Sequence, residues 1–212
     1  RVIIMSIILN EINYFWKLGF NEEKTDLYVK KYRDSYSVTI DVDKEVMDYG
    51  NRIIVIDDGL AQFSQKNFII LEAVDRFLRK NYCPDDIYLG RKDLYDFAIE
   101  TDSVGVLIAM RCFEWEEEYD KEVAKLKKDH SIIQSFFGEN IDTEYFCAYT
   151  SRLKAGTIEC RYMVFPKNFS LDDSQTFKRG LFEGDIRAYN PQFKTETKKG
   201  GPVPQKNDDF EI

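Results

Sequence analysis

Two short apolar segments, residues 94–99 and 104–111, constrain the fold of this chain more than any other part of its sequence. A polar turn at Asp102 separates them, a composition typical of neighbouring strands joined by a tight connection. The first segment carries an acid, Asp96, and the second ends on a cation, Arg111. The pattern therefore predicts a strand pair that holds a carboxylate and a guanidinium on adjacent strands of one sheet.

Carboxylates on neighbouring strands can hold a hard divalent cation, because such ions prefer oxygen ligands. A lysine beside them can orient water or stabilise charge on a phosphoryl group. The strand pair thus has the outline of a metal-dependent nuclease site. Its second strand, residues 104–111, nevertheless contains no carboxylate and no lysine.

Three further segments accompany the strand pair in a definite order, with residues 67–74 before it and residues 118–122 and 143–151 after it. Together with residues 94–111 they resemble the N-terminal nuclease domain of the R subunits of type I restriction enzymes. A related domain is found fused to some N6-adenine DNA methylases. The similarity covers residues 10–165, and the order of the segments is more specific than any single segment.

The resemblance implies the PD-(D/E)xK restriction-endonuclease fold, a mixed sheet flanked by helices with Asp on one strand and Glu-x-Lys on the next. Asp96 then occupies the Asp position, and Glu72 the acid that many members carry on the first helix, so both are implied metal ligands for Mg²⁺. Ala109 and Arg111 fall where Glu and Lys belong, which makes Asp96, Arg111 and Glu72 the candidate catalytic residues. Alanine offers no ligand, and arginine keeps its charge but does not release a proton.

Two functional classes are open at this point. The first is the N-terminal endonuclease-like domain of a type I restriction enzyme R protein acting in DNA restriction, with Glu114 or Glu116 completing the metal site. The second is a non-catalytic structural or DNA-contacting module of a larger restriction or restriction-methylation protein. The missing ligand and lysine favour weak Mg²⁺ binding and weak or absent cleavage, and the double change Ala109→Glu with Arg111→Lys is expected to rebuild the site. The implied partners are DNA and other subunits or domains of a restriction complex.

Composition limits the binding partners and the cellular compartment that can be expected for this chain. A net charge of −8 argues against a protein that coats nucleic acid indiscriminately, because Lys and Arg supply most non-specific affinity for phosphate. The four cysteines lack metal-ligand spacing and are expected to be free thiols of a cytoplasmic protein. His130 is the single histidine, which excludes His-pair chemistry within the chain. The apolar run at residues 1–9 is far shorter than the roughly 20 residues of a membrane span, so no membrane partner is expected.

The expected fold class is α/β, a restriction-endonuclease-like mixed sheet flanked by helices with an N-terminal α/β extension. The expected division is an extension packed on the core at residues 1–63, the core at 64–165 and a tail or linker at 166–212. Within the extension, residues 36–43 alternate apolar and polar side chains and predict a strand, followed by a second strand at 51–56.

Within the core, Ser64 is expected to cap a helix that runs to Tyr82. Glu72 lies off the centre of the apolar stripe of that helix, and without the resemblance it would be interpreted as a surface acid. A second long helix is expected over residues 116–137, followed by a strand pair. The sheet is expected to place Asp96 and Arg111 on adjacent strands near one edge.

Overall fold

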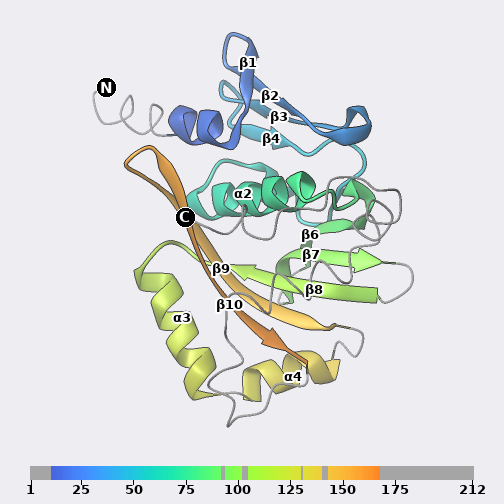
Figure 1. The fold of residues 1–212 in the computed structure, drawn as a ribbon, viewed down its shortest axis with the longest axis vertical. Helices are drawn as coiled ribbons and strands as arrows, with labels where there is room; N and C mark the ends of the chain where they lie inside the picture. The colour runs from blue at the N-terminus through green and yellow to red at the C-terminus, as the bar shows by residue number, and fades with distance from the viewer. Residues whose placement is uncertain (1–10, 92–93, 102–104, 130, 140–142, 168–212) are drawn as a thin grey trace, which may run out of the picture.

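Two β-sheets lie on opposite sides of the helix α2 (Gln65–Arg79) in the computed structural model, which has a mixed α/β architecture (Figure 1). One face of the second sheet packs on α2, and two further helices cover its other face. The structure describes residues 11–91, 94–101, 105–129, 131–139 and 143–167.

The first sheet is a four-stranded antiparallel meander that follows chain order. A helical segment at residues 11–18 precedes it. The expected strand at 36–43 is confirmed, and its residues Val38 and Ile40 are fully buried. The strands are β1 (Asn21–Lys24), β2 (Leu27–Lys31), β3 (Ser37–Asp41) and β4 (Val46–Asp48).

The strand expected at residues 51–56 is shorter than predicted, since only Ile54–Val55 forms a strand there. The hairpin partner of β3 is β4, because the alternating pattern resumes before the turn at Gly50 rather than after it. Only β5 (Ile54–Val55) forms farther on, and it pairs with the second sheet. The region before residue 64 therefore contributes a strand to the core sheet.

The second sheet is mixed and six-stranded, in the order β10-β9-β8-β7-β6-β5. The pairs β5/β6 and β8/β9 are parallel, and the other neighbours are antiparallel. The predicted adjacency of the strands that carry Asp96 and Arg111 is confirmed, but these strands occupy the middle of the sheet and not its edge. The strands are β6 (Ile87–Arg91), β7 (Tyr95–Thr101), β8 (Gly105–Cys112), β9 (Tyr145–Lys154) and β10 (Thr157–Pro166).

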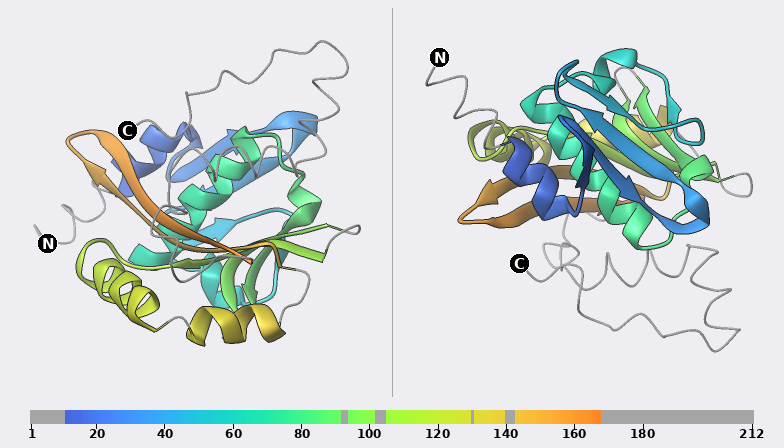
Figure 2. Two further views of the ribbon diagram at one scale, coloured as in Figure 1. Left: turned by 60° about the horizontal axis from the view of Figure 1, so that its bottom comes forward. Right: turned by 90° about the horizontal axis from the view of Figure 1, so that it is seen from above.

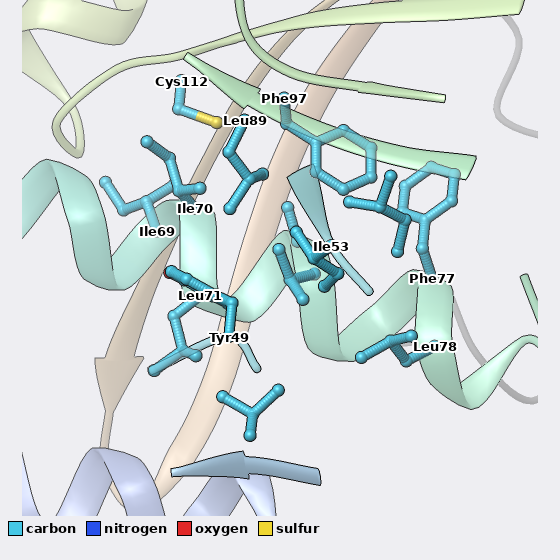
Figure 3. Packing of buried hydrophobic residues seen from close by; sticks show 14 of the residues in the cluster. Tyr49, Ile53, Ile69, Ile70, Leu71, Phe77, Leu78, Leu89, Phe97 and Cys112 are labelled. Atoms are coloured by element: carbon cyan, nitrogen blue, oxygen red, sulfur yellow. The ribbon is translucent and has the colours of Figure 1, made fainter. Parts of the chain in front are cut away.

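Helix α2 begins as expected. The Ser64 hydroxyl accepts a hydrogen bond from the Asn67 amide at 3.1 Å, a cap worth about 1 kcal/mol. Apolar side chains of α2 lie on two sides of the helix: Ile70 lies toward Leu89 and Cys112 of the second sheet, whereas Leu71 lies beside Tyr49 (Figure 3). The helix ends at Arg79, before the expected Tyr82, and the chain then turns through positive φ.

The long helix expected over residues 116–137 is wrong, because two helices occupy this region. They are α3 (Glu117–Lys128) and α4 (Ser131–Glu139). Asp129 leaves the helical conformation, and its carboxylate accepts from the Ser131 amide at 3.0 Å, which supplies a local alternative to continued helix. His130 lies outside the described residues.

The two faces of the second sheet carry separate apolar clusters. One joins the first sheet, α2 and residues such as Met110, Cys112 and Tyr149. The other joins Ala98 and Ala109 to side chains of α3 and α4, which lie across that face (Figure 2). The cluster to which a strand residue belongs therefore reports the face on which its side chain lies.

A bidentate ion pair ties the segment before β5 to the turn before β6. The Arg52 guanidinium donates to both carboxylate oxygens of Asp85, with Nε at 3.1 Å from each. These hydrogen bonds hold the pKa of Asp85 below its ordinary value. Because the folded-state pKa is lowered, the stabilisation is present above the usual aspartate pKa of about 3.9 and is lost as the pH falls through the folded value.

We expect the pKa of Asp85 to rise towards its ordinary value when Arg52 is replaced by methionine. NMR titration of the side-chain carboxyl in both proteins measures this change. The Asp41 carboxyl, whose partner Lys44 is untouched, is the internal control. An unchanged Asp85 pKa would show that the pair does not persist in solution.

Candidate functional site

Asp96 lies where β7 parts from β8. The last registered pair of the two strands is Phe97 with Met110, and beyond it the Asp96 carboxylate takes the place of backbone pairing by accepting the Cys112 amide at 2.8 Å. Its other oxygen, Oδ1, lies 2.9 Å from the Lys66 ammonium in the first turn of α2. Both carboxylate oxygens of Asp96 are therefore engaged by groups of the chain itself.

Glu72 is buried in the middle of α2, with 1% of its surface exposed, although its place off the centre of the apolar stripe is typical of a surface acid. Its carboxylate accepts from Arg76 Nε at 3.0 Å and from the Tyr149 hydroxyl on β9. Burial raises the pKa of Tyr149 well above its ordinary value, which keeps the phenol protonated and able to donate. Glu72 thus belongs to a buried ion pair within α2, which Tyr149 of β9 ties to the sheet by a hydrogen bond.

A second buried carboxylate, Asp75, faces the first sheet from the same helix. It accepts from the Tyr32 hydroxyl at 2.7 Å, forms an ion pair with Lys30 on β2, and lies 3.0 Å from Arg79 Nε. Neither this group nor the Glu72 pair was predicted from the sequence. A signal was present, since each acid of α2 has an arginine four residues later, the spacing that brings side chains together on a helix.

Ala109 and Arg111 lie on the opposite face of the sheet from Glu72. Ala109 is fully buried beside its registered neighbours Ala98 and Phe146, in the cluster covered by α3 and α4. Arg111 shares that face, with its guanidinium 5.9 Å from the ring centroid of Phe146. The implied set of Asp96, Glu72 and the Glu-x-Lys positions is therefore not gathered on one face.

The residues of β8 that do face α2 are apolar or thiol side chains: Ile108, Met110 and Cys112. Burial raises the pKa of the Cys112 thiol well above its ordinary value, and the nearby charges of Asp96 and Glu72 raise it further. Asp96 contacts Lys66 in the first turn of α2, and Glu72 lies on the same helix, so both acids are tied to α2. A carboxylate restored at position 109 would point away from both.

Glu114 and Glu116, considered above as replacement metal ligands, form local contacts at the start of α3 instead. Glu116 Oε1 lies 2.9 Å from Arg152 Nη1 on β9, and the same arginine reaches Glu159 of β10. The Glu114 amide donates to the carboxylate of Glu118 at 2.7 Å. These contacts assign Glu116 to a surface network that anchors α3 to the β9–β10 hairpin.

The residues that the resemblance assigns to Mg²⁺ do not fit a divalent ion in this arrangement. Glu72 is buried and paired with the Arg76 guanidinium, and Asp96 is paired with the Lys66 ammonium. The Ala109 side chain has no atom that could bind a metal. Within the described ranges of the chain, no three His, Cys, Asp or Glu side chains gather as a metal-binding group. Mg²⁺ needs several oxygen ligands in near-octahedral geometry, and it usually keeps waters beside one or two carboxylates.

Comparison with models of known protein families finds none that matches this chain, and no curated protein matches it. Among the helices that the structure describes, none has the length and apolar character needed to cross a membrane.

Proposed function

We propose that this chain is a degenerate nuclease-like domain of a restriction protein, serving as a non-catalytic structural or DNA-contacting module. The observation that carries the proposal is the buried Glu72 carboxylate, which is bound by Arg76 and Tyr149 where a nuclease would leave it open to metal. The ordered resemblance to restriction R subunits supplies the class. The mixed sheet flanked by helices supports it, as does the placement of Asp96 and Arg111 on adjacent strands.

The composition of β8 supports loss of catalysis on either face of the sheet. Residues 105–112 contain no Asp, Glu or Lys, so this strand offers neither a second carboxylate nor a lysine beside Asp96. Breaking the Glu72–Arg76 pair to bind metal would leave a buried guanidinium uncompensated, which is strongly unfavourable. Mg²⁺ binding is therefore weak in this proposal, and DNA cleavage by the restriction complex falls to other subunits or domains.

The proposed partners are DNA and the other parts of that complex. With a net charge of −8, the chain is not expected to load DNA by itself, because phosphate contacts need an excess of Lys and Arg. DNA contact is then made in the context of the larger protein.

The second candidate is an endonuclease that uses Asp96 and a lysine from outside β8. The 2.9 Å contact between Lys66 and Asp96 favours it, since acid and lysine lie side by side on a partly exposed rim. This candidate still needs a second carboxylate ligand, and the geometry around Glu116 directs that acid to Arg152 instead.

Incubation of the purified chain with supercoiled DNA in Mg²⁺ or Mn²⁺ tests the proposal. We expect no cleavage above that of the Asp96→Ala variant. Metal-dependent cleavage that disappears in Asp96→Ala would overturn the proposal in favour of the endonuclease. Cleavage that persists in Asp96→Ala, after repeated purification, would place an active site elsewhere in the chain and would overturn it as well.

A further inference from the structure

We propose that the Lys66 ammonium takes the place of a divalent ion at Asp96. It lies against the Asp96 carboxylate, where such an ion would bind. The inference rests on the proposed function, because it explains how a nuclease-like site is kept neutral without a metal. It assigns a role to a residue of the α2 helix that no sequence pattern indicated.

The charges around the site balance without an added ion. Glu72 is neutralised by Arg76 inside the protein, and Asp96 is neutralised by Lys66 at the rim. Two acids thus meet two cations, all contributed by the chain. A divalent ion approaching Asp96 would meet a fixed positive charge within contact distance of the carboxylate, and like charges this close oppose binding.

Of the two groups in the described residues that contact the Asp96 carboxylate, only Lys66 contacts it through a side chain and can be removed by substitution. Asp96 Oδ2 accepts from the Cys112 backbone amide, a contact that substitution of Lys66 leaves in place. The Lys66 side chain is 42% exposed and that of Asp96 19%, so the pair lies where solvent ions can reach it. Exchange of Lys66 for an uncharged residue should open Oδ1 to a cation without disturbing the core.

An alternative is that Lys66 and Asp96 form an ordinary surface ion pair. Exposed pairs contribute little to stability, so a melting experiment alone does not separate the two roles. Affinity for a divalent cation reports directly on the proposed role, because it measures whether the Lys66 ammonium keeps an ion away from Oδ1 of Asp96.

The experiment measures Mn²⁺ association by calorimetry in the full chain and three variants. They are Lys66→Met, Lys66→Arg and the double variant Lys66→Met with Asp96→Asn. We expect Lys66→Met to bind Mn²⁺ about tenfold more strongly than the parent, because a repelling unit charge at contact distance has been removed. Lys66→Arg keeps the charge and should match the parent, and the double variant should lose the gain. Lys66→Gln replaces Lys66→Met if the latter aggregates.

Weak Mn²⁺ binding in the parent with no gain in Lys66→Met would overturn the role of Lys66 and leave the proposed function standing. A gain that persists in the double variant would also overturn it, because the ion would then bind elsewhere. Tight binding by the parent that is lost on Asp96→Asn substitution, together with DNA cleavage, would instead refute the proposed function and the role of Lys66 with it.

Discussion

Replacement of Glu72 by alanine is expected to destabilise the fold by about 3–5 kcal/mol, because the Arg76 guanidinium is left buried without its carboxylate. Both side chains lie between α2 and β9, with 1% and 7% of their surfaces exposed. The Tyr149 hydroxyl loses its acceptor in the same variant. Urea unfolding followed by circular dichroism gives the difference in free energy.

The double variant Glu72→Leu with Arg76→Met should recover most of that loss, because apolar residues of similar size often replace a buried ion pair without cost. A matched control is Glu122→Ala on α3, whose partner Lys125 lies 3.7 Å away on the exposed surface. That change should cost only a few tenths of a kcal/mol. A loss of unfolding free energy below about 1 kcal/mol for Glu72→Ala would contradict a buried Glu72–Arg76 ion pair. Glu72 would then again be a candidate metal ligand.

The change Ala109→Glu is expected to destabilise the chain by at least about 3 kcal/mol rather than to rebuild a metal site. Ala109 is fully buried against Phe146 in the cluster covered by α3 and α4. A glutamate there must displace packed side chains and bury a carboxyl group within an apolar cluster. Thermal and urea unfolding measure the stability, and Mn²⁺ titration of the folded variant measures any new site.

The control for Ala109→Glu is Ala124→Glu, which introduces the same side chain on the exposed face of α3. Away from buried contacts such a change should stay within about 0.5 kcal/mol. A stable Ala109→Glu variant that binds Mn²⁺ through Asp96 would contradict the assignment of Ala109 to the face opposite Glu72.

The local features of the fold followed from the sequence because they depend on neighbouring residues. Ser64 caps α2 through its own hydroxyl, and the alternating pattern near Val38 describes a strand with one buried face. The pairing of the strands that carry Asp96 and Arg111 followed from the short connection between two apolar segments.

The face of the sheet to which each β8 side chain points could not be predicted in the same way. Its residues are apolar on both faces, since the sheet is covered by α2 on one side and by α3 and α4 on the other. Strands buried on both faces show no alternation, so nothing local distinguishes the direction of Ala109 from that of Met110. The apolar run predicted the strand, but it did not indicate which of its side chains point to each face of the sheet.

The ion pairs of α2 needed a different signal. Arginines four residues after Glu72 and Asp75 were visible, but the burial of the two acids depends on two sheets that come from distant parts of the chain. The contact between Lys66 of α2 and Asp96 of β7 also joins residues that lie 30 positions apart in the sequence. Such contacts are set by tertiary packing, which periodicity does not report.

The central claim is that Glu72 and Asp96, the acids of the proposed nuclease-like site, are neutralised by cationic side chains of the chain itself. Calorimetric titration of the unmodified chain with Mn²⁺ at neutral pH tests it most directly. We expect no saturable binding at micromolar Mn²⁺, and only weak heats at millimolar concentrations that Asp96→Asn leaves unchanged. Stoichiometric micromolar binding that Asp96→Asn abolishes would contradict the claim.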